Sequence, residues 1–266
     1  LWAWLALVLA LPLMSLTATA LIPTYGVALT AETVTFENFR EVLVRQAVTL
    51  RAFANSTLAA GAAAAALAGF AVVLGYYLAR PTGPARRVAG GVAALADIAY
   101  AVPGLVISIA FILAFIRPLP VLGVSLYGSL AVILLAYCAA FLSIALKPVG
   151  AAYAQLDGAL DDAARVAGAG IGRRLGRIFL PLVAPAAASG AILVFLTAYN
   201  EVTVSALLWS AGNETIGTVI FNYEDGGYTT LAAAMSVVTV AVTVALMLAL
   251  HVFGRHLPRG VVPWRA

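Results

Sequence analysis

Charge is the scarcest feature of this 266-residue sequence, because Asp, Glu, Lys and Arg together make up 10% of it while 64% is hydrophobic. A soluble globular domain carries about 25% charged residues. A chain with so few has too little polar surface to cover a body that is surrounded by water. This shortage excludes a soluble protein and indicates an integral membrane protein.

Residues that build metal, redox or catalytic sites are also few. The single cysteine, Cys138, allows neither a disulfide framework nor a thiolate metal cage, and it is expected to be a small core residue. The two histidines, His251 and His256, come at the inner end of the last apolar stretch and form no metal or catalytic pattern. We therefore expect no metal, no cofactor and no enzymatic activity in this chain.

Six apolar stretches are present instead. Each approaches or exceeds the roughly 20 residues that a helix needs to cross a bilayer, and none alternates as the strands of a membrane barrel do. The sequence thus predicts an all-α, polytopic membrane protein with about six transmembrane helices. The expected spans are 2–22, 56–79, 91–116, 126–147, 181–204 and 231–253.

The basic residues predict the orientation of these spans, because cytoplasmic loops are enriched in Lys and Arg. With both chain ends in the cytoplasm, most of the fifteen basic residues lie inside, whereas the reverse orientation places most of them outside. The pI of about 9.4 then reflects topology and anionic lipid, and nucleic acid is not expected as a partner. The inside set is Arg80, Arg86, Arg87, Lys147, Arg165, Arg173, Arg174, Arg177, Arg255, Arg259 and Arg265.

The first outer segment and the second span carry two further patterns. Charged and apolar residues mix over 23–55, which favours an amphipathic helix at about 36–50 followed by Asn55 or Ser56 as the cap of the second span. That span has a seam of small residues four apart, which favours close helix packing in lipid: Gly61, Ala65 and Gly69. The chain starts at Leu1 without Met, which suggests part of a longer protein, and a cleaved signal peptide over 1–22 is the alternative.

The third span contains an acid and a helix breaker. Asp97 lies well inside the span, where an ionisable group is costly unless it faces protein or water. It is either a gating contact or partner of a loop arginine, or an interfacial aspartate that caps a helix. Pro103 and Gly104 predict a kink near the middle of the membrane.

A long charged segment, "LDDAARVAGAGIGRRLGRIFLPL" at 160–182, interrupts the apolar pattern. Its first part has helical periodicity, and Asp161 and Asp162 can pair with Arg165 one turn later. Gly168 and Gly170 then permit a sharp turn. A second short helix is expected from Ile171. Its apolar side holds Ile171, Leu175 and Ile178, and its polar side holds Arg173, Arg174 and Arg177. Two short helices in an L on the inner membrane surface are predicted, and a helix lying flat on the membrane is the simpler alternative.

This segment resembles the EAA motif of ABC-importer permease subunits, the membrane components of binding-protein-dependent uptake systems. An acid, two alanines, a glycine four residues on, and Ile-x-Leu-Pro after nine more residues are all present, with Asp162 where Glu is usual. The resemblance covers about 50–253, including "NST" at 55–57 and "VPGLVISIA" in the third span. It implies three parts: a first helix and outer segment (1–49), a permease domain (50–253) and a cytoplasmic tail (254–266).

The chain has no G-x-x-x-x-G-K-[ST] motif for binding ATP, and "GAGIG" at 168–172 is followed by no Lys-Ser/Thr. ATP hydrolysis is therefore expected in a separate subunit, and the resemblance implies the partners of this chain. They are a cytoplasmic ABC ATPase dimer, an external solute-binding protein, a second permease unit (a second copy or a fused half) and the bilayer of the bacterial inner membrane. The coupling residues that it implies are Asp161, Asp162, Ala163, Ala164, Arg165, Gly168, Arg173, Arg174, Ile178, Leu180 and Pro181.

The end of the fifth span suggests a transport path. Thr197, Glu201 and Ser205 are four residues apart, so one helix face is expected to carry them, and an acid near a span end suits a water-filled route. The full predicted path set is Thr197, Tyr199, Asn200, Glu201, Ser205, Asp97 and Pro103. The segment "NEVTVSALLWSAGNETIGTVIFNYEDGG" resembles ferric-iron-type permeases, which favours ferric iron as cargo. An ion-gradient-driven transporter or channel is the alternative function.

Overall fold

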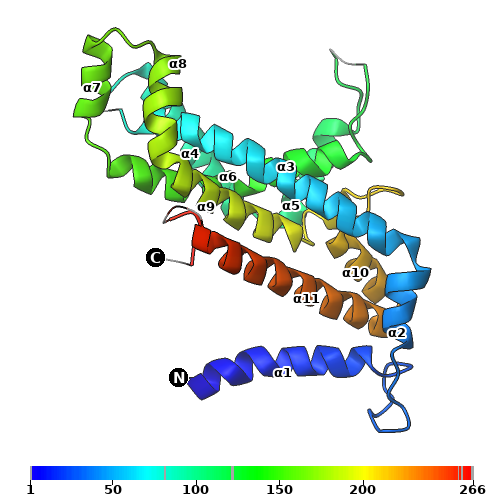
Figure 1. Ribbon diagram of the computed structural model, residues 1–266. Helices are drawn as coiled ribbons and strands as arrows, with labels where there is room; N and C mark the ends of the chain where they lie inside the picture. The colour runs from blue at the N-terminus through cyan, green and yellow to red at the C-terminus, as the bar shows by residue number, and fades with distance from the viewer. Residues whose placement is uncertain (1, 81, 121–122, 257, 259, 265–266) are drawn as a thin grey trace.

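The computed structural model describes residues 2–80, 82–120, 123–256, 258 and 260–264, and every regular element in these ranges is helical. Of the predicted tail, Arg259, Arg265 and the side chain of His256 lie outside the described part. Figure 1 shows long helices side by side and a short helical pair, α7 and α8, at one end. The longer helices are α1 (Trp2–Ala20), α3 (Ala47–Leu78), α4 (Pro84–Ala101), α5 (Gly104–Phe115), α6 (Leu130–Ala154), α9 (Leu180–Tyr199), α10 (Ile216–Asp225) and α11 (Thr229–Phe253). The short elements are α2 (Glu37–Arg40), η1 (Glu41–Arg45), α7 (Ala159–Val166), α8 (Ile171–Arg174), η2 (Leu175–Phe179), η3 (Ser205–Leu207) and η4 (Gly254–His256).

Four helical runs in the described ranges are long and apolar enough to cross a membrane: α3, α6, Ile171–Tyr199 and α11. A fifth span is present if α4 and α5 count as one, and these two helices meet at an angle of 116°. That bend lies between Ala101 and Gly104, where Pro103 predicted a kink. α1 contributes only a shorter apolar helix, Ala6–Ala20, so the predicted count of six stays a prediction.

The core is formed by α3, α6 and α9, which pack on one another. Small residues bring their backbones together, as expected for helices in lipid. A Cβ on Gly190 of α9 would lie 3.0 Å from the carbonyl oxygen of Ala145 in α6. A Cβ on Gly75 of α3 would lie 2.8 Å from the ring of Tyr153, also in α6. Around this core, α4 packs against α6, and α1 packs against α11.

The predicted small-residue seam of the second span does not pack within this chain. Gly61 is half-buried, Ala65 and Gly69 are exposed, and a Cβ on either glycine would meet nothing within 4 Å. The buried face of α3 uses other small residues, among them Ala60 and Ala64. Because alanine occurs all along this helix, the sequence did not distinguish the packed face from the outer one.

The predicted cap at Asn55 or Ser56 is wrong, because α3 begins at Ala47 and both residues lie inside it. Their polar groups bond to a distant segment instead. The amide of Asn55 donates to the carbonyl oxygen of Glu214 at 2.9 Å. The hydroxyl of Ser56 accepts the backbone N–H of Ile216 at 2.9 Å and so satisfies a donor at the start of α10.

The helix predicted over 36–50 is divided in two. α2 and η1 cover its first part, the backbone is extended at Gln46, and the remainder belongs to α3. Asn38 of α2 fixes this segment to the end of α1, because its buried side chain donates to the carbonyl oxygens of Ala20 at 2.9 Å and Ile22 at 2.7 Å.

Candidate coupling site and transport path

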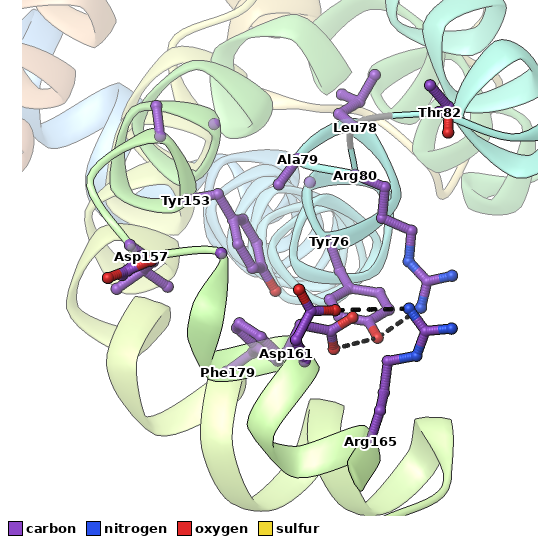
Figure 2. A pocket seen from close by; sticks show the side chains of 16 residues that line it. Tyr76, Leu78, Ala79, Arg80, Thr82, Tyr153, Asp157, Asp161, Arg165 and Phe179 are labelled. Atoms are coloured by element: carbon purple, nitrogen blue, oxygen red, sulfur yellow. Dashed lines mark hydrogen bonds and ion pairs between the residues drawn. The ribbon is translucent and has the colours of Figure 1, made fainter.

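A cavity of about 690 Å³ lies beside α7 at one end of the bundle. Its walls come from the end of α3, the end of α6, α7 and η2. Figure 2 shows polar and aromatic side chains meeting there. Those that organise the site are Tyr76, Arg80, Tyr153, Asp161, Arg165 and Phe179.

Local interactions explain why α7 forms. The side chain of Asp157 accepts the backbone N–H of Ala159 at 2.9 Å just before the first turn. Asp161 and Asp162 lie in the first turn and Arg165 in the last, which matches the partial charges at the two helix ends.

α7 ends in a glycine turn, at the predicted position. Gly168 has a φ of +77°, a left-handed conformation that glycine adopts without steric cost. The N–H of Gly168 donates to Arg165 O and that of Ala169 to Ala164 O, each at 2.9 Å, so the last carbonyls of the helix are satisfied. α8 begins at Ile171, as predicted, while the L arrangement of the two helices stays a prediction.

Asp161 connects α7 to two other elements. One of its carboxylate oxygens accepts a hydrogen bond from the hydroxyl of Tyr76 in α3 at 3.0 Å and another from the guanidinium of Arg174 in α8 at 2.8 Å. The predicted pairing of Asp161 with Arg165 is wrong, because Asp161 pairs with Arg174, which is buried. The turn at Gly168 folds α8 back so that Arg174 reaches the first turn of α7.

Aromatic rings support this contact from the bundle side. The ring of Tyr76 lies 5.1 Å from that of Phe179, and Phe179 lies 6.0 Å from Tyr153. Arg80 stacks over Tyr76 at 4.7 Å and donates to its hydroxyl at 2.6 Å. Tyr153 donates to the carbonyl oxygen of Val72 at 3.0 Å and thereby joins α6 to α3.

The remaining predicted coupling residues divide by exposure. Asp162 and Arg165 form an exposed pair at 3.7 Å, the one expected i,i+3 contact that is present. Ile171, expected on an apolar packed side, is 46% exposed. Ala163, Gly168, Arg173, Leu180 and Pro181 are exposed, Ile178 is half-buried, and Ala164 is buried.

Pro181 lies in the first turn of α9, as predicted, but no loop precedes it. α8, η2 and α9 form one helical run from Ile171 to Tyr199. η2 is a π turn, in which the N–H of Leu180 bonds back to Leu175 O. A wider turn before a proline is understandable, because Pro181 has no N–H and its ring crowds the carbonyl one turn back.

The predicted polar face of the fifth span does not exist, because α9 ends at Tyr199. Glu201 lies in the irregular segment that follows, and Ser205 begins η3. The carboxylate of Glu201 accepts the backbone N–H groups of Val204 at 2.6 Å and Ser205 at 3.1 Å. A side chain that bonds its own backbone in this way competes with helix continuation, which a periodicity argument ignores.

The neighbouring path residues have separate environments. Thr197 and Asn200 are exposed, whereas Tyr199 is buried. The amide oxygen of Asn200 accepts from the hydroxyl of Thr243 in α11 at 3.1 Å, so this residue joins the end of α9 to the last helix.

Asp97 pairs with a lysine of α6. The ammonium of Lys147 lies 2.8 Å from its carboxylate, which also accepts the hydroxyl of Ser143. The predicted pairing with a loop arginine is therefore wrong, because the cation is a lysine within a helix. The role of Asp97 as a gating contact stays a prediction. Pro103 lies in the break between α4 and α5, far along the chain from Lys147.

Sequence analysis missed Tyr76, Arg80 and Phe179, although they surround Asp161. Tyr76 and Arg80 belong to no motif and are about 80 positions before α7, and Phe179 occupies the unspecified position of Ile-x-Leu-Pro. One signal was available, since the "YYLAR" run ends an apolar span and aromatic residues gather at membrane interfaces. Among the residues that the structure describes, no three His, Cys, Asp or Glu side chains are placed to hold a metal ion.

Curated relatives are ABC transporter permeases. The chain is 30% identical to a putative ABC transporter permease protein of Streptomyces antibioticus over 71% of this chain and 79% of that one. It is 32% identical to a probable ABC transporter permease protein of Sinorhizobium fredii over 61% of this chain, a match that spans 28% of the relative. A putative 2-aminoethylphosphonate transport system permease protein of Salmonella typhimurium is 25% identical over 59% of this chain and 58% of its own length.

Solved structures show a related fold. A bacterial ABC transporter involved in the import of the acidic polysaccharide alginate superposes with a TM-score of 0.68 at 18% identity, covering 97% of this chain and 94% of that one. A bacterial alginate ABC transporter in complex with a pentasaccharide-bound periplasmic protein gives 0.71 at 15% identity, covering 99% and 93%.

The family model for the binding-protein-dependent transport system inner membrane component matches residues 71–262. This range includes both the Asp161 contacts and the bent pair of helices α4 and α5. The chain therefore belongs to the family of binding-protein-dependent transport system inner membrane components, and it is a membrane transport subunit and not an enzyme.

Proposed function

We propose that this chain is the permease subunit of an ATP-driven importer and that α7 and α8 transmit the movement of a cytoplasmic ABC ATPase dimer to the spans. The observation that carries the proposal is the exposed side of α7, which offers Asp162, Arg165 and Val166 beyond the bundle. Val166 is 91% exposed on an eight-residue helix that is otherwise held firmly by Asp161. A rigid, exposed and charged protrusion suits docking to a soluble partner.

The orientation follows from this assignment. Figure 1 shows the beginning of α1, the end of α11 and α7 toward the same end of the bundle. With α7 in the cytoplasm, both chain ends are cytoplasmic, in agreement with the distribution of basic residues, and the inner membrane of a bacterium is the proposed location. In this proposal the chain has three parts: a first helix and outer segment (1–49), a permease domain (50–253) and a cytoplasmic tail (254–266).

Two further partners belong to the proposal. An external solute-binding protein would deliver cargo to the end opposite α7. A second permease unit, either a second copy or a fused half, would complete the path. The half-buried Gly61 and the exposed Ala65 and Gly69 suit such a helix contact. Transport would then proceed by alternating access, in which the ATPases close and open the paired units.

The transport path is proposed to include Asp97 and Pro103, because both lie at the bent third span. The side chains of Asp97 and Lys147 are 51% and 69% exposed in this single chain. Charged groups at such depth are costly toward lipid, so water or another subunit is the expected neighbour. Thr197, Tyr199, Asn200, Glu201 and Ser205 are retained only as residues near the end of α9, with Glu201 assigned to local structure.

Ferric iron is not carried forward as cargo. Among the relatives and solved structures named above, one name refers to 2-aminoethylphosphonate and two titles refer to alginate. The described residues also offer no cluster for a metal ion. We propose only that a small solute is moved inward.

Co-purification tests the proposal. The permease expressed with an ABC ATPase from the same genome should form a stable complex that hydrolyses ATP in lipid vesicles. Asp162→Asn with Arg165→Gln should weaken that association, whereas Arg40→Gln, an exposed change in α2, should not. A complex that forms equally well with the α7 variant would contradict docking through α7. Solute flux driven by an ion gradient without any ATPase would favour the alternative of a secondary transporter or channel.

A further inference from the structure

The two adjacent aspartates of α7 have opposite surroundings. The side chain of Asp162 is 78% exposed, and its ion-pair partner Arg165 is exposed as well. The side chain of Asp161 is 21% exposed, and one of its oxygens already accepts from Tyr76 and Arg174. Asp162 is thus available to an external partner, whereas Asp161 is occupied inside the chain.

The contacts of Asp161 add a connection that the backbone does not provide. The chain links α7 to α6 through 155–158 and to α9 through α8 and η2. Tyr76 belongs to α3 and precedes Asp161 by 85 positions in the sequence. Its hydrogen bond to Asp161 therefore joins α7 directly to a third span, and this span is the longest helix, with 32 residues.

Both partners of Asp161 are held in place. The Tyr76 side chain is buried between Arg80 and Phe179, and its hydroxyl accepts a hydrogen bond from Arg80 at 2.6 Å. The side chain of Arg174 is only 7% exposed. Its Nε is buried without a hydrogen-bond partner among the described residues, so the Asp161 carboxylate is the anion that balances this guanidinium. Charge-assisted bonds of this kind are directional and short.

We propose that Asp161 is a positioning residue that ties the coupling helix α7 to α3 through Tyr76, so that movement of α7 reaches α3 as well as α6 and α9. The inference rests on the proposed coupling function of α7. The two adjacent aspartates then have different roles. Asp162 contacts the ABC ATPase, and Asp161 transmits the movement of α7 to the helix bundle. A tie made of one tyrosine hydroxyl and one buried ion pair is stiff, because the side chains of Tyr76 and Arg174 are both buried.

Tyr76→Phe is the sharpest test. It removes the hydroxyl that joins α3 to α7 and leaves the Arg174 pair and the ring contact with Phe179 intact. The matched control is Tyr153→Phe, which removes a hydroxyl of the same kind at the same end of the bundle but joins α6 to α3 without touching α7.

The distance between α7 and α3 is the primary measurement. Spin labels at Leu160→Cys in α7, which is outside the proposed docking residues, and at Val73→Cys in α3 are measured in a Cys138→Ala background, in the full complex with and without ATP and vanadate. For the labelled protein without further substitution, and for Tyr153→Phe, we expect one narrow distance distribution both with and without nucleotide. Tyr76→Phe should broaden the distribution and make it change with nucleotide. A Tyr76→Phe distribution as narrow as that of Tyr153→Phe would overturn the inference.

Variants of Asp161 distinguish loss of the connection between α7 and α3 from loss of folding. Asp161→Asn alone leaves Arg174 buried and unpaired, which is expected to destabilise the protein. Asp161→Ala combined with Arg174→Gln leaves neither a lone buried charge nor an acceptor for the Tyr76 hydroxyl, so it should fold and still show the broadened distance. A narrow distance in this double variant would contradict the inference.

Hydrolysis gives an independent readout. Stimulation of ATP hydrolysis by the binding protein should fall several-fold in Tyr76→Phe, while the amount of ATPase bound stays unchanged. Asp162→Asn should instead reduce the amount bound. If the unmodified chain binds no ATPase, the proposed function fails, yet the label distance in the permease alone still tests the tie.

Discussion

The guanidinium of Arg51 in α3 binds both carboxylate oxygens of Glu214, at 2.8 Å and 3.1 Å, although the two residues are 163 positions apart. Glu214 is buried, and it also accepts the backbone N–H of Gly212 at 3.0 Å. A bidentate pair of this kind fixes orientation as well as distance. It holds the segment before α10 against α3, at the opposite end of that helix from Tyr76.

This pair predicts a pH dependence of stability. Burial raises the pKa of Glu214, but the hydrogen bond from Arg51, the backbone N–H of Gly212 and the charge of Arg51 lower it further, so that it lies below the ordinary value of 4.5. A carboxyl whose folded pKa is lowered contributes stability above its unfolded pKa and loses that contribution as the pH falls through the folded pKa. Arg51→Gln should therefore lower the Tm most near pH 7, and the gap to the unmodified protein should shrink below pH 4.5.

Thermal unfolding in detergent between pH 3.5 and 7 measures this gap. Arg40→Gln is the matched control, because Arg40 and its partner Glu37 are both more than half exposed and such pairs contribute little. A gap that stays constant with pH would mean that the Arg51–Glu214 pair does not set the acid sensitivity.

Gly168 is expected to be essential for the turn that follows α7. At a φ of +77°, a residue with a side chain is strained by about 1–2 kcal/mol. Gly168→Val should therefore displace α8 and uncouple hydrolysis from transport. Gly170→Ala is the control, since Gly170 has a φ of −66° and open space around it. Unchanged uptake together with unchanged ATPase binding in Gly168→Val would refute this prediction.

Glu201 is predicted to act mainly on local structure. Its carboxylate accepts Val204 N–H and Ser205 N–H, much as a capping residue does, and loss of a cap costs about 1 kcal/mol. Glu201→Ala should lower the Tm of the purified permease. Glu201→Gln should lower the Tm less than Glu201→Ala does, because its amide oxygen can still accept a hydrogen bond. If Glu201→Ala leaves the Tm and complex assembly intact but abolishes transport, the residue belongs to the path after all.

Asp97 and Lys147 are expected to depend on each other. Asp97→Asn or Lys147→Gln alone leaves one charge inside the apolar helices without its partner, whereas the double variant leaves none. We therefore expect each single variant to reduce ATP-driven uptake more than the double variant does, a coupling that a double-mutant cycle measures. Additive losses would show that the two residues act independently.

Helix content, the bend at Pro103 and the glycine turn at Gly168 were all predictable, because each depends on residues close together in the sequence. Apolar runs predict membrane helices, proline removes a donor, and glycine permits a positive φ. Helix ends were less predictable. α3 starts nine residues before the expected 56, and α9 stops at Tyr199, because a side chain such as Glu201 redirects the backbone.

Partners distant in the sequence were not predictable. The motif marked Asp161 and Asp162 together, but only the fold shows that one faces Tyr76 and Arg174 while the other is exposed. Lys147 was counted as a loop residue and lies in α6 beside Asp97. A single sequence without an alignment contains no signal for such pairs, since both members are determined by how helices pack.

Gly217 lies in a crowded position and Gly61 in an open one. A Cβ on Gly217 of α10 would overlap the carbonyl oxygen of Glu201 and lie 2.8 Å from the Cα of Val202, and neither backbone atom can rotate away. Gly217→Ala should therefore separate α10 from the segment after α9 and destabilise the permease by about 1–3 kcal/mol, as overpacking does. Gly61→Ala adds the same methyl group where nothing lies within 4 Å, so it should leave the Tm of the single chain unchanged or slightly raised, since alanine favours helices. Equal Tm values for the two variants would show that the contact between α10 and the Glu201 segment is looser than the structure has it.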